Sequence, residues 1–237
     1  MQTFIQDLLS FNGALFTTIH APAGHTALLD TLMPILANDV IYLFGLLIIF
    51  LWWTPGGKSS AARAERSISR EAVVWTIAAF VLALLLNIAL GALLPEPRPF
   101  ISFHFTPLIT HSADASFPSD HTAASFAIAG ILLIRFFMTF RRAAPPVLPQ
   151  SMNRPQGVGG PVVSGLRWKT GLLAAVGLAM AIAIGYARVY VGVHYPLDII
   201  GGAIVGLLAA LIVTLARGLL RPVARAVEGG AHLVHLA

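Results

Sequence analysis

The part of the chain that decides the fold reads ARVYVGVHYPLD, residues 187–198, and it joins two long apolar runs. Each run is close to the 20 or so residues that a helix needs to cross a bilayer. The joining stretch contains Arg188, His194 and Asp198, and charge between apolar helices is costly enough to require a reason. The stretch therefore predicts two membrane-spanning helices connected by a short turn that carries a functional site.

The composition of the whole chain is that of a membrane protein. Hydrophobic residues make up 57% of the 237 residues and charged residues 11%, whereas soluble domains are about one quarter charged. Five apolar runs predict spanning helices, at about residues 40–53, 73–94, 119–140, 168–190 and 196–216. Residues 1 to about 36 are more polar, and their helical spacing of apolar residues predicts an interfacial helix followed by a turn.

These observations predict an all-α fold, a polytopic membrane helix bundle of about five transmembrane helices plus an N-terminal interfacial helix. We interpret residues 1–237 as a single membrane domain with its polar motifs between residues 87 and 202. The Pro/Gly-rich stretch 141–167 predicts a linker outside the bilayer, and residues 217–237 predict a surface tail. The absence of cysteine excludes disulfides and thiol chemistry. No cleavable signal peptide is expected, since the first Lys or Arg is Lys58.

Three polar clusters mark the ends of the apolar runs. PRP at residues 97–99 follows the second run, PSDH at residues 118–121 begins the third, and Arg188 to Asp198 joins the last two. Because successive spanning helices alternate in direction, all three clusters are expected at the same face of the membrane. The sequence therefore predicts one composite site built from segments that are far apart in the chain.

Basic residues predict which face this is. The segments assigned to the opposite face carry many Lys and Arg residues, namely Lys58, Arg63, Arg66, Arg70, Arg141, Arg142, Arg154, Arg167, Lys169, Arg217, Arg221 and Arg225. By the positive-inside rule, the linkers and the C-terminus are cytoplasmic. The site then faces the periplasm, or the outside, of a bacterial inner membrane. We interpret the net charge of +5 as topology and affinity for the lipid surface, with no nucleic-acid partner.

The residue types in the clusters indicate binding and cleavage of a phosphate ester. Guanidinium groups such as those of Arg98 and Arg188 hold phosphate oxygens and stabilise transition-state charge. A histidine near Asp198 can be held in one tautomer and act as a nucleophile, while His121 can protonate the leaving oxygen. Arginines and the N–H groups of the helix start at Ser119 neutralise phosphate charge, so neither a metal nor another cofactor is expected.

The three clusters resemble the motifs of the type 2 phosphatidic acid phosphatases, also known as the membrane lipid phosphatase and vanadium haloperoxidase superfamily. That family's motifs read Lys-x6-Arg-Pro, Pro-Ser-Gly-His and Ser-Arg-x5-His-x3-Asp. This chain has RP at residues 98–99, PSDH at 118–121 and R-x5-H-x3-D at 188–198, in the same order. The resemblance covers about residues 70–215, and the PSDH variant is most similar to the bacterial undecaprenyl-diphosphate phosphatases.

The resemblance implies a role for each matching residue. It makes His194 the nucleophile that becomes phosphohistidine, Asp198 its orienting partner and His121 the general acid. The phosphate-binding residues that it implies are Arg98, Ser119 and Arg188. Further residues expected to support the site are Asp120, Glu96, Pro118 and Tyr195.

The resemblance also implies a substrate and a cellular role. The lipid partner would be a polyprenyl diphosphate, hydrolysed to the monophosphate on the outer face. The product carrier lipid is recycled for peptidoglycan synthesis in cell wall biogenesis. Bacitracin competes for the diphosphate, so bacitracin resistance is an expected consequence of the activity. The sequence leaves the oligomeric state open.

Two positions depart from the family pattern. Gly91 stands where the first motif has lysine, and Ala187 stands where the third motif has serine. Each lost contact to a charged group would weaken transition-state binding by about 1.5–3 kcal/mol unless another group replaces it. Asp120 and Glu96 add negative charge beside the site, and either orient Arg98 or recognise a more extended head group.

Other interpretations stay open at the level of sequence. His194 and Asp198 also fit a structural polar pair or a metal site, although no third ligand is evident. His20, His25, His104 and His111 are interpreted as solvated loop residues. The same chemistry fits phosphatidylglycerophosphate, phosphatidic acid or a lipid A phosphate, while Gly91 and Ala187 also fit a non-catalytic lipid-head-group binding or flippase protein.

Overall fold

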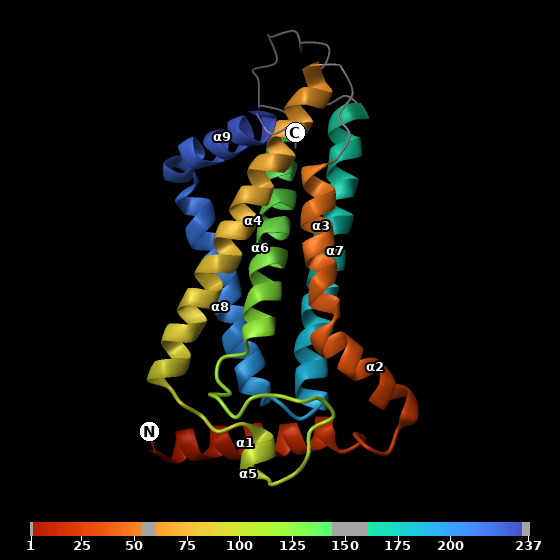
Figure 1. The fold of residues 1–237 in the computed structure, drawn as a ribbon, viewed down its shortest axis with the longest axis vertical. Coiled ribbons are helices and arrows are strands. Elements are labelled where there is room, and N and C mark those ends of the chain that lie inside the picture. The colour runs from red at the N-terminus through yellow and green to blue at the C-terminus, as the bar shows by residue number, and fades with distance from the viewer. Residues whose placement is uncertain (1, 54–59, 144–160, 234–237) are drawn as a thin grey trace, which may run out of the picture.

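The computed structural model describes residues 2–53, 60–143 and 161–233 of the chain, and these form helices joined by turns and loops (Figure 1). The helices of the described ranges, in chain order, are α1 (Gln2–His20), α2 (Ala27–Asn38), α3 (Val40–Trp52), α4 (Ser60–Leu93), α5 (Pro99–Ser102), α6 (Asp120–Ala143), α7 (Pro161–Tyr190), α8 (Pro196–Leu215) and α9 (Arg217–Leu233). The predicted all-α class is confirmed.

Four helices contain segments that are long and apolar enough to cross a membrane by themselves. The segments are Arg70–Leu93 in α4, Asp120–Met138 in α6, Trp168–Tyr190 in α7 and Pro196–Leu215 in α8. Helices α2 and α3 meet at a bend of 45° and together qualify as a fifth. The prediction of about five spans is therefore confirmed, and the chain is an integral membrane protein. The predicted span at residues 40–53 is too short to cross a bilayer by itself, and α2 supplies the additional length.

Two helices lie across the ends of the bundle (Figure 1). Helix α1 crosses the end that holds the loop after α4, and α9 lies at the opposite end. Helix α1 exposes Phe4, Leu9 and Phe11, while its Phe16 is buried beside Val189 and Tyr195. This arrangement suits a helix that rests in the interface with its apolar side chains toward lipid.

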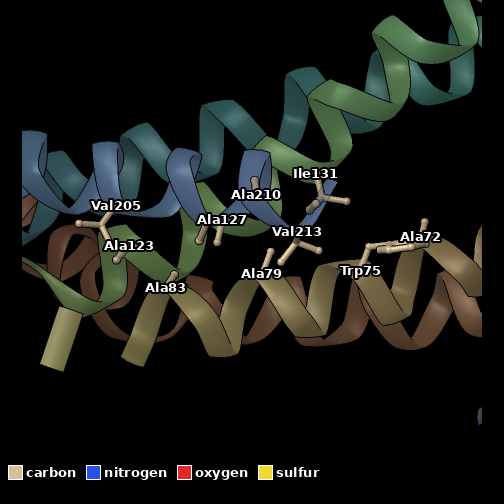
Figure 2. Packing of buried hydrophobic residues seen from close by; sticks show 11 residues of the cluster. Ala72, Trp75, Ala79, Ala83, Ala123, Ala127, Ile131, Val205, Ala210 and Val213 are labelled. Carbon is tan, nitrogen blue, oxygen red and sulfur yellow. The ribbon is translucent and has the colours of Figure 1, made fainter. Parts of the chain in front are cut away.

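Small residues let α4, α6 and α8 approach closely. Figure 2 shows Ala79 and Ala83 of α4 facing Ala123 and Ala127 of α6, with side chains of α8 beside them. Helices in lipid associate through van der Waals packing, because burying apolar surface brings no gain where the solvent is itself apolar. Close backbone approach therefore stabilises this part of the bundle. A second cluster joins α3 to α6 and α7 around Phe44.

The boundaries differ from the sequence prediction at the end opposite the loop after α4. Arg70, predicted in a polar loop, is buried within α4, where its guanidinium lies 5.3 Å from the ring centroid of Trp52. Cation–π attraction and a hydrogen bond from Nε to the Trp52 carbonyl (3.5 Å) compensate its burial. The predicted linker 141–167 is shorter, because α6 continues to Ala143 and α7 begins at Pro161. Predictions that concern residues 54–59, 144–160 and 234–237, including Lys58 and Arg154, lie outside the described residues.

The alternating directions of α4, α6, α7 and α8 bring the three polar clusters to one end. The C-terminus of α4, the N-terminus of α6 and the turn between α7 and α8 all lie at the lower end in Figure 1, near α1 and α5. The predicted convergence is thus observed. It places the charged side chains at or just beyond the ends of the apolar spans, away from the centre of the bilayer, where solvating them would cost most.

Replacing Gly206 by Ala should destabilise the bundle. A Cβ atom there would lie 2.3 Å from the Ala123 carbonyl oxygen and 2.7 Å from the Ala127 nitrogen, so α8 would have to move away from α6. We expect a loss of about 1–3 kcal/mol, measured as a lower Tm of the purified protein in detergent. Gly45→Ala in α3 is the matched control, since nothing lies within 4 Å of its added Cβ. Equal Tm values for the two variants would contradict the close-packing argument.

Candidate active site

The predicted site residues come from five segments at one end of the bundle. Each is at a helix end or in a turn: Arg98 before α5, Ser119 and His121 at the start of α6, Arg188 in the last turn of α7, His194 in the α7–α8 turn and Asp198 in the first turn of α8. Except for the half-buried His121, these side chains are almost wholly buried. Buried polar groups require partners, and the contacts described next supply them for most of the site atoms. Nε of Arg188 and Oδ1 of Asp198 have no hydrogen-bond partner among the described residues.

The turn between α7 and α8 depends on Gly192. Its φ is +90°, in the region that glycine adopts at little cost, and a Cβ there would lie 2.6 Å from the ring of Phe105. The turn is closed by the Val193 N–H donating to the Arg188 carbonyl over 3.2 Å. This conformation brings the side chains of Arg188 and His194 together, with Nη2 of the arginine 3.3 Å from Nε2 of the histidine.

Asp198 is the buried carboxylate that orients the site. Its side chain has no solvent exposure, and Oδ2 accepts hydrogen bonds from the Ser116 hydroxyl (2.5 Å) and the Tyr195 N–H (2.7 Å). The Tyr195 contact runs from the position before α8 to its third residue, as in one half of a capping box. The Asp198 carbonyl accepts from the Ser119 N–H at 3.1 Å. Asp198 therefore fixes the starts of α6 and α8 relative to each other.

The contacts of His194 determine its tautomer. Nδ1 lies 2.9 Å from the Ser116 carbonyl and 3.3 Å from Oδ2 of Asp198. A carbonyl oxygen only accepts, so Nδ1 carries the proton and Nε2 has a free lone pair. Burial lowers the pKa of His194 well below its ordinary value of 6.5, and the charges of Arg188 and Arg98 lower it further. The imidazole is therefore neutral near pH 7, as a nucleophile must be.

Both arginines direct guanidinium nitrogens at Nε2 of His194. Nη1 of Arg98 lies 3.2 Å from it and Nη2 of Arg188 lies 3.3 Å from it. Arg98 is held by its Nη1 donating to the Val193 carbonyl (2.9 Å) and by an ion pair with Asp114 (2.7 Å). Nη1 of Arg188 donates to Oδ1 of Asn38 over 3.1 Å. A lone pair facing two fixed cations suits attack on a bound phosphate.

The family profile of the PAP2 superfamily matches residues 72–221 of the chain, more than half of its length. The chain belongs to this superfamily. Its matched region contains every residue of the three motifs, from Arg98 to Asp198. The motif residues thus lie within the region that the family profile matches.

Relatives with described functions extend over most of the chain. Undecaprenyl-diphosphatase BcrC of Bacillus subtilis (strain 168) is 28% identical over 211 residues, which cover 89% of this chain and 86% of the relative. Bacitracin transport permease protein BcrC of Bacillus licheniformis is 31% identical over 188 residues, covering 79% and 71%. The crystal structure of Aquifex aeolicus LpxE is similar at a TM-score of 0.56 and 26% identity, covering 85% and 93%. The protein is thus a membrane phosphatase of the PAP2 superfamily, homologous to undecaprenyl-diphosphatases.

His111 is a site residue of this PAP2 protein that sequence reasoning missed. It was predicted to be solvated, and this prediction is wrong: its side chain is 19% exposed and its ring centroid lies 6.1 Å from that of His194. Nη2 of Arg188 donates to its Nε2 over 2.7 Å. Nδ1 then carries the proton of the neutral ring and lies 3.2 Å from the Ser112 carbonyl. His111 therefore positions Arg188.

The three other histidines predicted as solvated differ in their surroundings. His20, also predicted as solvated, stacks on Phe16 at a centroid distance of 5.2 Å and donates from Nδ1 to the Tyr190 carbonyl over 2.7 Å. It therefore anchors α1 across the site end. His25 and His104 are exposed, as predicted.

Asp114 is the carboxylate that orients Arg98. The expectation that Asp120 or Glu96 orients this arginine is therefore wrong. Oδ1 of Asp120 instead accepts a hydrogen bond from the Asn87 side chain of α4 over 2.6 Å. Glu96 is half-buried, and burial raises the pKa of its carboxyl group. Asn87 and Asp114 lie in no family motif, so sequence spacing gave no signal for either.

The remaining predicted residues support the site in different ways. The same Asn87 side chain donates to the Pro118 carbonyl at 2.9 Å. The Ser119 hydroxyl is buried and accepts from Thr122 over 3.1 Å, and Tyr195 packs on Phe16 in an edge-on arrangement, with centroids 5.5 Å apart. His121 is half-buried at the start of α6, where the charges of Arg188 and Arg98 act on its imidazole. Within the described ranges, no three His, Asp or Glu side chains are grouped to hold a metal ion.

Replacing His111 by Ala should lower kcat/KM of phosphate release about tenfold to a hundredfold, because Arg188 loses a hydrogen-bond acceptor worth about 1.5–3 kcal/mol. His111→Gln, whose amide oxygen can accept from Arg188, should restore part of the rate. His25→Ala, at an exposed histidine, is the matched control and should match the wild type. A His111→Ala enzyme with unchanged kinetics, or with no rescue by Gln, would refute the positioning role.

Proposed function

We propose that the protein hydrolyses undecaprenyl diphosphate, or a closely related isoprenyl diphosphate, to the monophosphate through a phosphohistidine intermediate. The observation that carries this proposal is the neutral His194, whose Nε2 lone pair faces two arginines 3.2 and 3.3 Å away. The substrate class is supported by the BcrC relative named as an undecaprenyl-diphosphatase. The bacitracin-related name of the second relative agrees with the same lipid.

In the first step, Nε2 of His194 attacks the terminal phosphorus of the diphosphate. A P–N bond forms as the bond from phosphorus to the bridging oxygen breaks. Arg98 and Arg188 hold the non-bridging oxygens, which keep their negative charge through the transition state. As the imidazole becomes positive, the Asp198 carboxylate beside Nδ1 stabilises it. This charge develops only during the reaction, so its stabilisation raises the rate as well as the affinity.

His121 completes both steps by moving a proton. In its protonated form it donates to the bridging oxygen, which leaves with the lipid monophosphate. The resulting neutral imidazole then takes a proton from water as the water oxygen attacks the phosphohistidine. Cleavage of the P–N bond releases inorganic phosphate and returns the lone pair to Nε2 of His194. The enzyme ends each cycle in its starting protonation state.

The absence of the family serine at Ala187 is offset by two other contacts. The Arg188 guanidinium is held from α2 by Asn38 (3.1 Å) and from the loop after α4 by His111 (2.7 Å). In the family pattern the serine supplies a hydroxyl next to this arginine, whereas here Ala187 is wholly buried in apolar packing. Arg188 is thus positioned without that hydroxyl, which favours the catalytic interpretation over a protein that has lost turnover.

An apolar recess beside the site suits the start of the lipid chain. A cavity of about 450 Å³ is lined by Leu93, Leu94, Pro95, Glu96, Phe117 and Leu197, at the ends of α4 and α8. Isoprenyl units are wholly apolar, so they gain by leaving water for such a surface. The half-buried Glu96 is the polar group of this lining, and it lies near the loop that carries Arg98.

We also propose that the site faces outward and that the protein resides in a bacterial inner membrane. Lys169, Arg217 and Arg221 lie at the end of the bundle opposite the site. Lys and Arg next to spanning helices favour the cytoplasmic side. With this orientation, the linkers and the C-terminal helix are cytoplasmic and the site meets lipid in the outer leaflet.

The substrate proposal predicts phosphate release from purified protein incubated with undecaprenyl diphosphate in EDTA. His194→Ala removes the nucleophile and should lower kcat by at least about 10⁴-fold, while His25→Ala should retain full activity. Release from phosphatidylglycerophosphate, phosphatidic acid or lipid A, but not from the prenyl diphosphate, would contradict the substrate and keep the chemistry. Lipid binding without phosphate release by the wild type would contradict an enzymatic function altogether.

The orientation proposal predicts a one-sided labelling pattern in intact cells. The chain has no cysteine, so single cysteines can be placed at Ala113, beside the site, and at Lys169, at the far end, both of which are exposed. A membrane-impermeant maleimide should label Ala113→Cys in intact cells, and Lys169→Cys only after permeabilisation. The reverse pattern would overturn the orientation and leave the chemistry untouched.

A further inference from the structure

A second cavity, lined by apolar and basic side chains, lies at the end of the bundle opposite the active site. It has a volume of about 120 Å³ and opens between α4, α6, α8 and α9. Three of its lining residues are arginines: Arg135 of α6 and Arg217 and Arg221 of α9. Trp75 and Ile131 form part of its apolar wall, and Figure 2 shows both at the end of the cluster that also contains Ala72.

The charges around this cavity do not balance. Glu71 is the carboxylate among its lining residues, against three guanidinium groups. Oε1 of Glu71 pairs with Nε of Arg221 at 3.8 Å. The negative charge of Glu71 also attracts the guanidinium group of Arg135. Arg217 donates from Nη1 to the sulfur of Met138 over 3.4 Å, and a thioether is a weak acceptor. Among the described residues, the lining therefore carries two more positive charges than negative ones.

The cavity lies where the apolar spans end. The spans of α4, α6 and α8 end here at Arg70, Met138 and Leu215, which is the depth of lipid head groups. On α9, Leu219 and Val223 are exposed beside the arginines. Exposed apolar side chains next to basic ones are typical of a helix that lies in the membrane interface. The cavity thus lies at the depth expected for lipid phosphates.

We propose that this cavity binds the phosphate of an anionic phospholipid in the leaflet opposite the active site. Basic pockets between spanning helices at this depth bind acidic head groups, and guanidinium groups suit phosphate oxygens. The volume holds several water molecules, which is room for a phosphate group beside Trp75. The excess of positive charge favours a lipid with net negative charge over a zwitterionic one. The inference is independent of the substrate proposed for the active site.

The test titrates the full-length protein in neutral detergent with short-chain phosphatidylglycerol and follows the rise in Tm, because a ligand that binds the folded state stabilises it. Arg135→Gln and Arg217→Gln should each weaken the apparent affinity about fivefold, since one interfacial basic residue contributes about that much. Lys169→Gln, which removes an exposed charge at the same end but outside the cavity, should leave the affinity unchanged. Arg217 is exposed, so its variant tests the site even if Arg135→Gln fails to fold.

Comparison ligands identify what the cavity recognises. Phosphatidylcholine and inorganic phosphate, titrated over the same concentrations, should raise the Tm much less than phosphatidylglycerol does. Equal stabilisation by phosphatidylcholine would show that net lipid charge is irrelevant and overturn the proposal. Equal stabilisation by inorganic phosphate would point to a free anion instead and overturn it as well. Unchanged affinity in Arg217→Gln, or an equal loss in Lys169→Gln, would exclude this cavity as the binding site.

Discussion

The hydrogen bonds of the buried Asp198 carboxylate are the interaction on which the site end of this protein depends. One oxygen, Oδ2, contacts the Ser116 hydroxyl, the Tyr195 N–H and Nδ1 of His194, groups that come from the loop after α4 and from the α7–α8 turn. An ionised carboxylate away from water is costly unless it is hydrogen-bonded. For Oδ2, the chain meets this requirement with segments that must all be folded correctly, whereas Oδ1 has no partner among the described residues. His194 is therefore oriented only when the whole site end is assembled.

The sequence could predict the parts of the structure that are marked by a regular pattern of apolar residues or by a sequence motif. Apolar runs of about 20 residues fix the spans, as the match at Trp168–Tyr190 illustrates. Alternating helix direction then brings Arg98, His121 and His194 to one end without any knowledge of tertiary packing. Both inferences rest on the bilayer, which limits length and direction more strongly than water limits a soluble fold.

The parts that could not be predicted lie mostly in the loop between α4 and α6. His111, Asp114 and Ser116 each contact a motif residue, but a loop has no periodicity that tells which side chains point inward. Arg70 was missed for a related reason. A lone arginine at the edge of an apolar run is consistent with a loop, and its stacking on Trp52 depends on the placement of α3. Partners of this kind are set by tertiary structure alone.

The two arginines that face Nε2 of His194 have a consequence for the resting enzyme. Two like charges close to one uncharged nitrogen repel each other, and both guanidinium groups are almost fully removed from water. This repulsion therefore lowers the stability of the native state until an anion binds between the two arginines. Any tetrahedral oxyanion that fits between the arginines relieves this repulsion, and its stabilisation of the native state grows with the logarithm of its concentration above Kd. Released phosphate is such an anion, so the same electrostatics that attract the substrate also slow the release of this product. Turnover is therefore sensitive to the concentration of phosphate in the surrounding medium.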